Sequence, residues 1–142
     1  RARPELVPNA VEECLRYDAP VKSIQRIAAQ DVELQGKLLR KDDRIRWFIS
    51  SANRDPQKFS QPETFDITRE PNQHVAFGSG VHHCLGAQLA RAEARLAFTG
   101  LLERFRDIRL LTAQPPFKDN VVLRGLRALP IGATPARVLA SP

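Results

Sequence analysis

The stretch FGSGVHHCLG, residues 77–86, restricts the fold of this chain more than any other part of its sequence. Two of its glycines, Gly78 and Gly80, are separated by one residue and allow backbone turns with positive φ, which other residues rarely adopt. Directly after it, from Leu85 to about Arg104, leucines and alanines recur at helical spacing. The sequence therefore predicts a tight loop carrying Cys84 that opens into a long helix.

The remaining pattern predicts a mainly helical (α+β) fold with small β-sheets. Residues 7–17 have helical periodicity with a proline in the first turn, and residues 23–49 alternate as short strands. Residues 52–76 contain three prolines in a polar setting and are expected to be irregular. Residues 121–131 predict a β-hairpin with its turn near Gly125, and residues 133–142 are expected to fray.

Composition limits the function classes. The net charge is +6, but the basic residues are scattered and the chain has one Trp and one Tyr, so no nucleic-acid partner is expected. No apolar run or leader pattern indicates a membrane segment or secretion. Two cysteines are too few for a disulfide framework and favour a reducing, cytoplasmic location. Because the chain has no methionine, even at position 1, it is expected to be a fragment or a processed piece of a longer protein.

The loop around Cys84 is compatible with several chemistries. A dinucleotide fingerprint is excluded because His83 stands where its third glycine is required. A zinc site, a cysteine nucleophile activated at a helix N-terminus, and an inert buried thiol all stay open. Axial ligation of heme iron by the thiolate uses the most features: glycines beside a flat porphyrin, the Gly86 amide near sulfur, and a small residue at Ala90.

The stretch FGSGVHHCLGAQLAR resembles the heme-ligand signature of the cytochrome P450 family, F-G-x-G-x-H-x-C-x-G. The matched positions are Phe77, Gly78, Gly80, His82, Cys84 and Gly86; Ser79 falls at a variable position. The resemblance implies that Cys84 binds the iron of heme b, and that the other matched residues, with Ala90, contact the cofactor.

Further segments resemble the same family in the expected order. By spacing alone, Glu13 and Arg16 in EECLR form an ordinary i,i+3 surface pair. The resemblance instead implies a buried structural ion pair, with Arg69 of FDITR as its third member. Arg26 and His82 resemble the residues that bind the two heme propionates. In GKLLRKDDRI, Arg40 and Asp42 replace a usual proline and glycine, which predicts looser strand pairing there.

The resemblance also implies which residues face a substrate. These are Val21, Lys22, Ser23 and Ile24 after the first helix, and Val122 and Leu123 at the tip of the closing hairpin. The implied activity is a heme-thiolate monooxygenase that uses O₂ and inserts one oxygen atom into a small organic molecule. A ferredoxin-type or flavin-type electron donor would dock near Cys84, where Arg91 and Arg95 add positive charge.

Residues 1–142 are expected to be the C-terminal heme-ligand portion of one cytochrome P450 domain. The family's distal-helix motif A/G-G-x-D/E-T has no match, so the N-terminal majority is expected to be missing and the fragment to be inactive and poorly folded alone. When full length, the protein is expected to be a monomer. A non-catalytic heme-binding remnant and a cysteine-dependent hydrolase or transferase are the alternatives.

Overall fold

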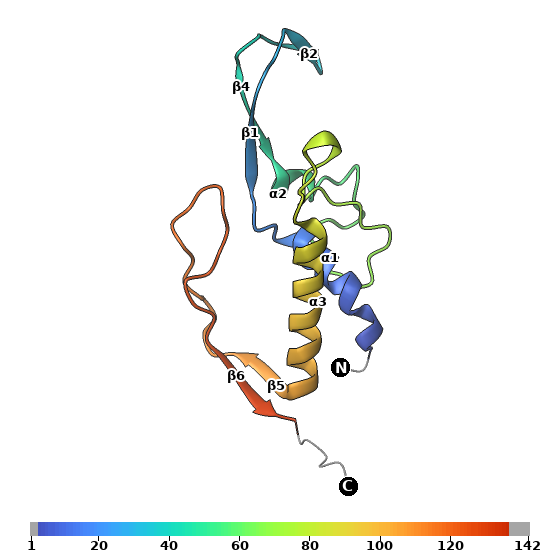
Figure 1. Ribbon diagram of the computed structural model, residues 1–142, viewed down its shortest axis with the longest axis vertical. Coiled ribbons are helices and arrows are strands. Elements are labelled where there is room, and N and C mark those ends of the chain that lie inside the picture. Colours follow the sequence, from blue (N-terminus) through green and yellow to red (C-terminus); the bar gives the residue numbers. More distant parts are fainter. Residues whose placement is uncertain (1–2, 137–142) are drawn as a thin grey trace.

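The computed structural model describes residues 3–136 of the 142-residue chain. It is elongated, with the helices α1 (Val7–Tyr17) and α3 (Ala87–Arg104) side by side at its centre and β-hairpins toward both ends (Figure 1). Three short helical turns complete the helices: η1 (Pro4–Leu6), α2 (Ile49–Ala52) and η2 (Gly80–His82). Three separate two-stranded antiparallel sheets accompany them, which confirms the predicted mixed class of helices and small sheets.

Helix α1 has the bounds that the sequence predicts. Pro8 lies in its first turn, where a missing amide costs nothing, and Val7 and Val11 are buried on its apolar side. The helix ends at Tyr17 because Ala19 precedes Pro20, and the residue before a proline avoids the α region. The opposite side of this helix is also buried, and it is charged.

Strands β1 (Ser23–Ile27) and β4 (Arg44–Phe48) pair in a ribbon that projects from the helices (Figure 1). Beyond them, β2 (Val32–Leu34) and β3 (Lys37–Leu39) form a hairpin around a turn at Gly36, which has φ +74°. Asp42 has φ +71°, which explains why glycine suits that position in relatives. The turn is nevertheless closed, since the Asp42 amide donates to the Ala28 carbonyl at 2.8 Å.

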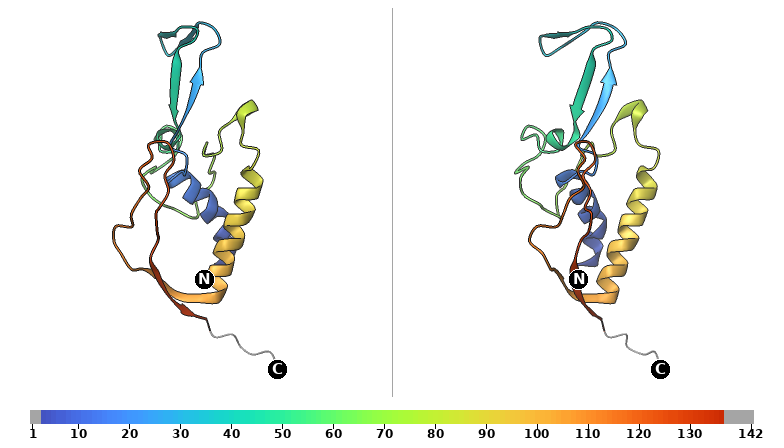
Figure 2. Two further views of the ribbon diagram at one scale, coloured as in Figure 1. Left: turned by 60° about the vertical axis from the view of Figure 1, so that its left-hand side comes forward. Right: turned by 90° about the vertical axis from the view of Figure 1, so that its left-hand side faces the viewer.

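Residues 53–79 are irregular, close to the segment 52–76 that the sequence predicts, and they wrap one side of α1 before the chain reaches the loop that carries Cys84, the cysteine loop (Figure 2). It contains turns and bends but no helix or strand. A segment of this length stays ordered only where its backbone groups find partners. Those partners are side chains of α1, described below.

Helix α3 buries Ala87 against the rest of the chain and leaves its leucine row uncovered. Leu85, Leu89 and Leu96 have exposed fractions of 103%, 65% and 75%. An apolar row of this kind is a surface that folded proteins normally cover. In this chain α3 is therefore packed on one side only.

The C-terminal region differs from its prediction. Strand β5 (Phe105–Leu110), which the sequence pattern did not indicate, pairs with β6 (Ile131–Pro135), so residues 133–135 are a strand and not a frayed end. The predicted fraying of residues 137–142 lies outside the described residues. Between the strands, the hairpin turns within residues 119–124, and Gly125 lies in its returning arm, where its carbonyl accepts from the Lys118 amide at 2.8 Å.

Candidate functional site

The loop before α3 is folded tightly around its glycines. Gly78 and Gly80 have φ +72° and +63°, and a side chain on Gly78 would press against the His82 carbonyl oxygen at 3.3 Å. The Cys84 amide donates to the Phe77 carbonyl oxygen at 2.9 Å and closes the loop. These glycines are therefore required by the backbone path that presents Cys84.

Cys84 precedes the N-terminal end of α3, which starts three residues later at Ala87, and the cysteine is exposed. Within residues 3–136, no group of three or more His, Cys, Asp or Glu side chains is placed to hold a metal ion. In the same described part, no hydrogen bond joins the Cys84 thiol to His82 or His83. The zinc site and the cysteine nucleophile gain no support from this geometry.

An open and mostly apolar cleft adjoins Cys84. It consists of two neighbouring hollows of about 290 and 450 Å³. Both hollows are lined by Ile24, Arg26, Ile49, Gly78 and His82; the first also reaches Leu15, Pro20, Val21, Ala76, Phe77 and Cys84, and the second Trp47, Phe48, Ala52, Val75 and Ser79. We call this combined space the cysteine cleft. Its apolar walls suit a large flat hydrophobic ligand.

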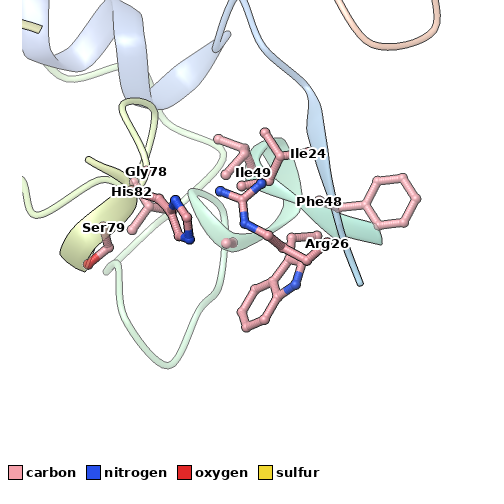
Figure 3. Close-up of a pocket in the computed structure, with 10 residues that line it drawn as sticks. Ile24, Arg26, Phe48, Ile49, Gly78, Ser79 and His82 are labelled. Carbon is pink, nitrogen blue, oxygen red and sulfur yellow. The ribbon is translucent and has the colours of Figure 1, made fainter. Parts of the chain in front are cut away.

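Two basic side chains, Arg26 and His82, interrupt the apolar lining. Arg26 extends from β1 and His82 from η2, and their nitrogen-bearing ends turn toward one another across the cleft (Figure 3). The Arg26 guanidinium donates only to the adjacent Gln25 carbonyl, at 2.9 Å, and meets no carboxylate among the described residues. A guanidinium with most of its N–H groups unpaired can donate two parallel hydrogen bonds to the carboxylate of a ligand.

All the residues predicted to contact cofactor or substrate divide into two sets. Phe77, Gly78, His82, Cys84, Arg26, Val21 and Ile24 line the cysteine cleft, whereas Gly80, Gly86, Ala90, Lys22, Ser23, Val122 and Leu123 do not. Ser23 is buried in the strand β1, and Gly80 shapes the loop by its backbone. The structure thus brings seven of the predicted residues together along one cleft, and the other seven are not part of its lining.

The closing hairpin is fastened to the start of β1. The Lys22 amide donates to the Val122 carbonyl at 2.8 Å, and Val21 forms an isolated bridge with Leu123. Arg124 adds an ion pair with Asp18 at 2.6 Å. The tip predicted to face the substrate is therefore held in register with the segment that lines the cleft.

Glu13 and Arg16 form a fully buried ion pair on α1. Both side chains have an exposed fraction of 0%, and the guanidinium donates two parallel hydrogen bonds to the carboxylate, each 2.8 Å long. Burying two charges is costly unless every remaining donor and acceptor finds a partner. The irregular segment supplies those partners.

Arg16 donates to the carbonyl oxygens of Asn53 and Pro62 at 2.9 Å and of Thr64 at 3.1 Å. The Glu13 carboxylate accepts the Asp66 amide at 2.9 Å. It also accepts the Asn72 side-chain amide at 3.0 Å and the Arg69 guanidinium at 3.3 Å. The two charged residues of α1 thus hold a long stretch of irregular backbone in place.

Arg69, proposed from the sequence as the third member, lies at this ion pair. It also donates to the carbonyl oxygens of Ser60, Gln61 and Thr64. Burial raises the pKa of Glu13, but the hydrogen bond from Arg16, the Asp66 amide and Arg69 outweigh it, so the pKa lies below its ordinary value. The carboxylate is therefore charged at neutral pH, as the network requires.

Sequence reasoning missed a second polar cluster, formed by Glu12, His74 and Arg91. Arg91 donates to both carboxylate oxygens of Glu12, at 2.7 and 2.9 Å, and the His74 ring lies 3.1 Å from the same carboxylate. It also missed Asn53, a fully buried residue whose side-chain oxygen accepts the Val75 amide at 2.8 Å. No local spacing signals either feature, because the partners come from distant segments.

No helix within residues 3–136 is long and apolar enough to cross a membrane. A family model described as Cytochrome P450 matches residues 1–128 of the chain. This chain belongs to the cytochrome P450 family, as its loop, its buried ion pair and this match together show. Membership of this family implies a heme cofactor and the use of O₂.

Individual relatives agree with this assignment. The chain is 48% identical over 132 residues to cytochrome P450 CYP107DY1 of Priestia megaterium, covering 92% of this chain and 32% of that protein. It is 47% identical over 136 residues to nocardicin C N-oxygenase of Nocardia uniformis, covering 92% and 34%. The chain thus spans about a third of the length of these relatives.

Solved structures show the same fold. The structure of P450BioI in complex with an acyl carrier protein ligated with hexadec-9Z-enoic acid matches with a TM-score of 0.91 and 39% identity, covering 94% of this chain and 35% of that one. The polyketide synthase cytochrome P450 PksS of Bacillus subtilis matches with a TM-score of 0.87 and 47% identity, covering 92% and 34%. The architecture described above is therefore that of the corresponding part of these enzymes.

Proposed function

We propose that the intact protein is a heme-thiolate monooxygenase, and that this chain supplies the wall of the active site that binds heme b. One observation carries the proposal. Cys84 lies at an apolar cleft that also contains Arg26 and His82, two hydrogen-bond donors without a carboxylate partner among the described residues. A thiol, apolar walls and two such donors match the iron, ring and two propionates of heme.

The residues present fit the cofactor in their chemistry. Cys84 would bind the iron, Gly78 would keep a side chain away from the ring, and Phe77, which lines the same hollow as the cysteine, would help to keep water from the sulfur. Arg26 and His82 would each bind one propionate, because charged hydrogen bonds to carboxylates are strong. Every member of this set lines the cysteine cleft.

When bound, heme would supply the activation of O₂: with two electrons from a partner and two protons, one oxygen atom would enter a C–H or similar bond of the substrate and the second would leave as water. The protein contributes ligation, orientation and exclusion of water. A thiolate ligand favours O–O cleavage in this family because it gives electron density to the iron. Cys84 is the residue in this chain that would do so.

The substrate is proposed to be a small organic molecule contacted by the segment from Val21 to Ile24 and by the hairpin tip. Val21 and Ile24 line the cysteine cleft, and the tip is fastened beside them. Relatives of this chain are named for biotin biosynthesis, polyketide biosynthesis and nocardicin C N-oxygenation.

An electron donor of the ferredoxin or flavin type is proposed to dock near the start of α3. Of the two arginines expected to contribute charge, Arg95 is exposed, whereas Arg91 is tied to Glu12. Docking therefore relies on Arg95 more than on Arg91. Arg95→Glu should slow reduction by an acidic donor and reduce its dependence on salt, whereas unchanged rates would argue against docking at this face.

The uncovered row of Leu85, Leu89 and Leu96 supports the proposal that these 142 residues are the heme-ligand portion of a larger single domain. The rest of that domain would cover α3 and complete the substrate pocket. We expect the 142-residue chain by itself to be inactive and prone to aggregate. A monomeric preparation that melts cooperatively would contradict this expectation.

The decisive experiment is an absorbance spectrum of the intact gene product, reduced and exposed to carbon monoxide. Thiolate ligation produces a strongly red-shifted Soret band, and Cys84→Ala should abolish that band. Cys14→Ala is the matched control, since it removes the other thiol, which lies on α1 outside the cysteine cleft. A band that survives Cys84→Ala, or an iron bound by nitrogen in the parent, would overturn the proposal.

A non-catalytic heme-binding protein would give the same spectrum. It is distinguished by single-turnover measurements with O₂ and a chemical reductant across a panel of small organic compounds. Formation of an oxygenated product supports the monooxygenase, whereas heme binding without any product from a broad panel favours the non-catalytic protein.

A further inference from the structure

The cluster of Glu12, His74 and Arg91 lies directly behind the cysteine loop. Its members come from α1, from the irregular segment and from α3, three parts of the chain that share no local sequence. The side chains are sheltered: exposed fractions are 22% for Glu12, 2% for His74 and 19% for Arg91. Polar groups so enclosed are held by one another in a fixed arrangement.

The cluster is connected to Phe77 in two ways. The Arg91 guanidinium lies over the Phe77 ring, 4.6 Å from its centroid, in cation–π geometry. The His74 ring packs near the same side chain, with centroids 6.3 Å apart. Phe77 in turn holds Cys84, because its carbonyl oxygen accepts the cysteine amide. A continuous set of contacts therefore leads from Glu12 to the cysteine.

The hydrogen bonds of His74 define its protonation state. Its Nδ1 accepts the Ala76 amide at 3.2 Å, so the ring proton is on Nε2, which donates to Glu12. Burial lowers the pKa of His74, and although Glu12 opposes this effect, the charges of Arg91 and Arg16 reinforce it. A neutral ring thus links the irregular backbone leading to Phe77 with the carboxylate that anchors Arg91.

We propose that Glu12, His74 and Arg91 are positioning residues that fix the Phe77 ring beside the Cys84 sulfur and thereby set how strongly the thiolate donates electron density to iron. The inference rests on the proposed function. A fixed ring keeps water away from sulfur. Once the ring loosens, water donates hydrogen bonds to the thiolate, which draws electron density from the iron and shifts the midpoint potential to more positive values.

Three substitutions of His74 distinguish the contribution of its hydrogen bond to Glu12 from that of its hydrogen bond with the Ala76 amide. His74→Gln keeps a donor that reaches toward Glu12, His74→Asn keeps an acceptor for the Ala76 amide, and His74→Ala removes both. In the intact holoenzyme we expect the alanine variant to shift the potential most, in the positive direction, and the two conservative variants to restore part of the parent value. If the alanine variant fails to fold, the comparison of parent, Gln and Asn variants carries the test.

A matched pair of arginines on α3 separates positioning from charge. Arg91→Gln and Arg95→Gln each remove one positive charge from the same helix, one turn apart, but only Arg91 contacts Glu12 and Phe77. We expect Arg91→Gln to shift the potential positively and to change the Soret band, and Arg95→Gln to leave both close to the parent. Equal shifts in the two variants would show a charge effect and overturn the inference.

A second readout does not depend on heme. The Cys84 amide is bonded to the Phe77 carbonyl, so loosening Phe77 should speed hydrogen exchange at that amide, on the order of tenfold, in the intact apoprotein. Arg95→Gln should exchange at the parent rate. Unchanged exchange at Cys84 in both Arg91→Gln and His74→Gln would overturn the inference.

The two proposals fail in different ways. A parent protein without a thiolate-type spectrum contradicts the proposed function. A parent protein with that spectrum, whose potential and Cys84 exchange are insensitive to substitutions at His74 and Arg91, contradicts the positioning inference and leaves the proposed function in place.

Discussion

The buried ion pair of α1 and the exposed leucine row of α3 stand in contrast. Around Glu13 and Arg16, charged groups are fully buried and their hydrogen bonds are completed within this chain. Along α3, apolar side chains such as Leu85 and Leu96 are left in water. The charges of Glu13 and Arg16 are thus satisfied within this chain, although Asn53 Nδ2 and Asn72 Oδ1 beside them are buried without a partner, whereas the apolar row of α3 is exposed. This contrast indicates that the buried ion pair orders the irregular segment locally, whereas covering the apolar row of α3 is left to the rest of the domain proposed above.

The largest expected effect lies at the buried ion pair. Arg16→Ala leaves the Glu13 carboxylate buried without its main partner and releases three backbone carbonyls, so we expect a loss of about 3–5 kcal/mol in the free energy of unfolding. The measurement is urea unfolding of the intact protein. Arg3→Ala, which breaks an exposed ion pair with Glu5, is the control and should cause no measurable change. Similar losses in both variants would remove the distinction between the two regions.

The second effect tests whether the leucine row becomes covered. In the intact protein, Leu96→Ala should cost about 2–4 kcal/mol, the usual cost of truncating a buried leucine. In the 142-residue chain the same side chain is 75% exposed, so the substitution should instead improve solubility. Unfolding midpoints of the intact protein and sedimentation of the short chain measure the two outcomes. An intact protein that tolerates Leu96→Ala without loss would mean that α3 stays uncovered.

A smaller effect is expected at the donors of the cysteine cleft. Arg26→Gln should remove one charge-assisted hydrogen bond to a heme propionate, worth about 1.5–3 kcal/mol, or roughly 10- to 150-fold in heme dissociation. His82→Gln should weaken binding less. Transfer of heme to an excess of a heme-scavenging protein gives the rates, and Arg46→Gln, on the neighbouring strand β4, serves as control. Rates that do not respond to Arg26→Gln would exclude it from propionate binding.

The smallest effect is the pH dependence of stability. Because the pKa of His74 is lowered in the folded protein by burial, the unfolded chain takes up the proton first as pH falls. The stability that the neutral ring contributes is complete above pH 6.5, the ordinary pKa of histidine. It decreases as the pH falls from there through the lower pKa of His74 in the folded protein. The charged groups that face the ring are Glu12, Arg91 and Arg16. Unfolding of the intact protein between pH 7.5 and 5.5 (about the range in which His titrates) should show this decrease, and His74→Gln should flatten it.

Acidification below pH 4.5 should bring a further decrease. The pKa values of Glu12 and Glu13 are both lowered in the fold, so their contribution is present above the ordinary value of 4.5 and disappears as pH falls through the folded values. Burial opposes both shifts, and the hydrogen bonds from Arg91 and Arg16 outweigh it. Stability that is flat across this range would contradict the description of both networks.

Some of this fold follows directly from local sequence. The first helix is defined by Pro8 at its start and Pro20 beyond its end, and the turn of the cysteine loop is defined by Gly78 and Gly80. Strand β5 does not follow in this way. Asp107 adopts φ +55° and a register shift separates Arg106 from Arg109, so the bulge removes the alternation by which a strand is recognised.

The site divides in the same manner. Cys84 and the glycines are contiguous in sequence, so a short motif identifies them. Glu13 and Arg16 by spacing alone resemble a surface pair, and only resemblance to a family predicts their burial. The cluster behind Phe77 joins Glu12 to His74 and Arg91, 62 and 79 residues away, and no pattern within a window of ordinary length connects such positions.

The fastening of the hairpin tip to the start of β1 has a consequence for altering specificity. Because Val122 and Leu123 are bonded through their backbone to Val21 and Lys22, the two segments behave as one cassette. Grafting only residues 116–127 from a relative would mismatch the seam at Asp18 and Arg124. Transplanting both segments together should preserve their backbone pairing and the ion pair between Asp18 and Arg124. The new side chains should then take the same positions relative to the cysteine cleft.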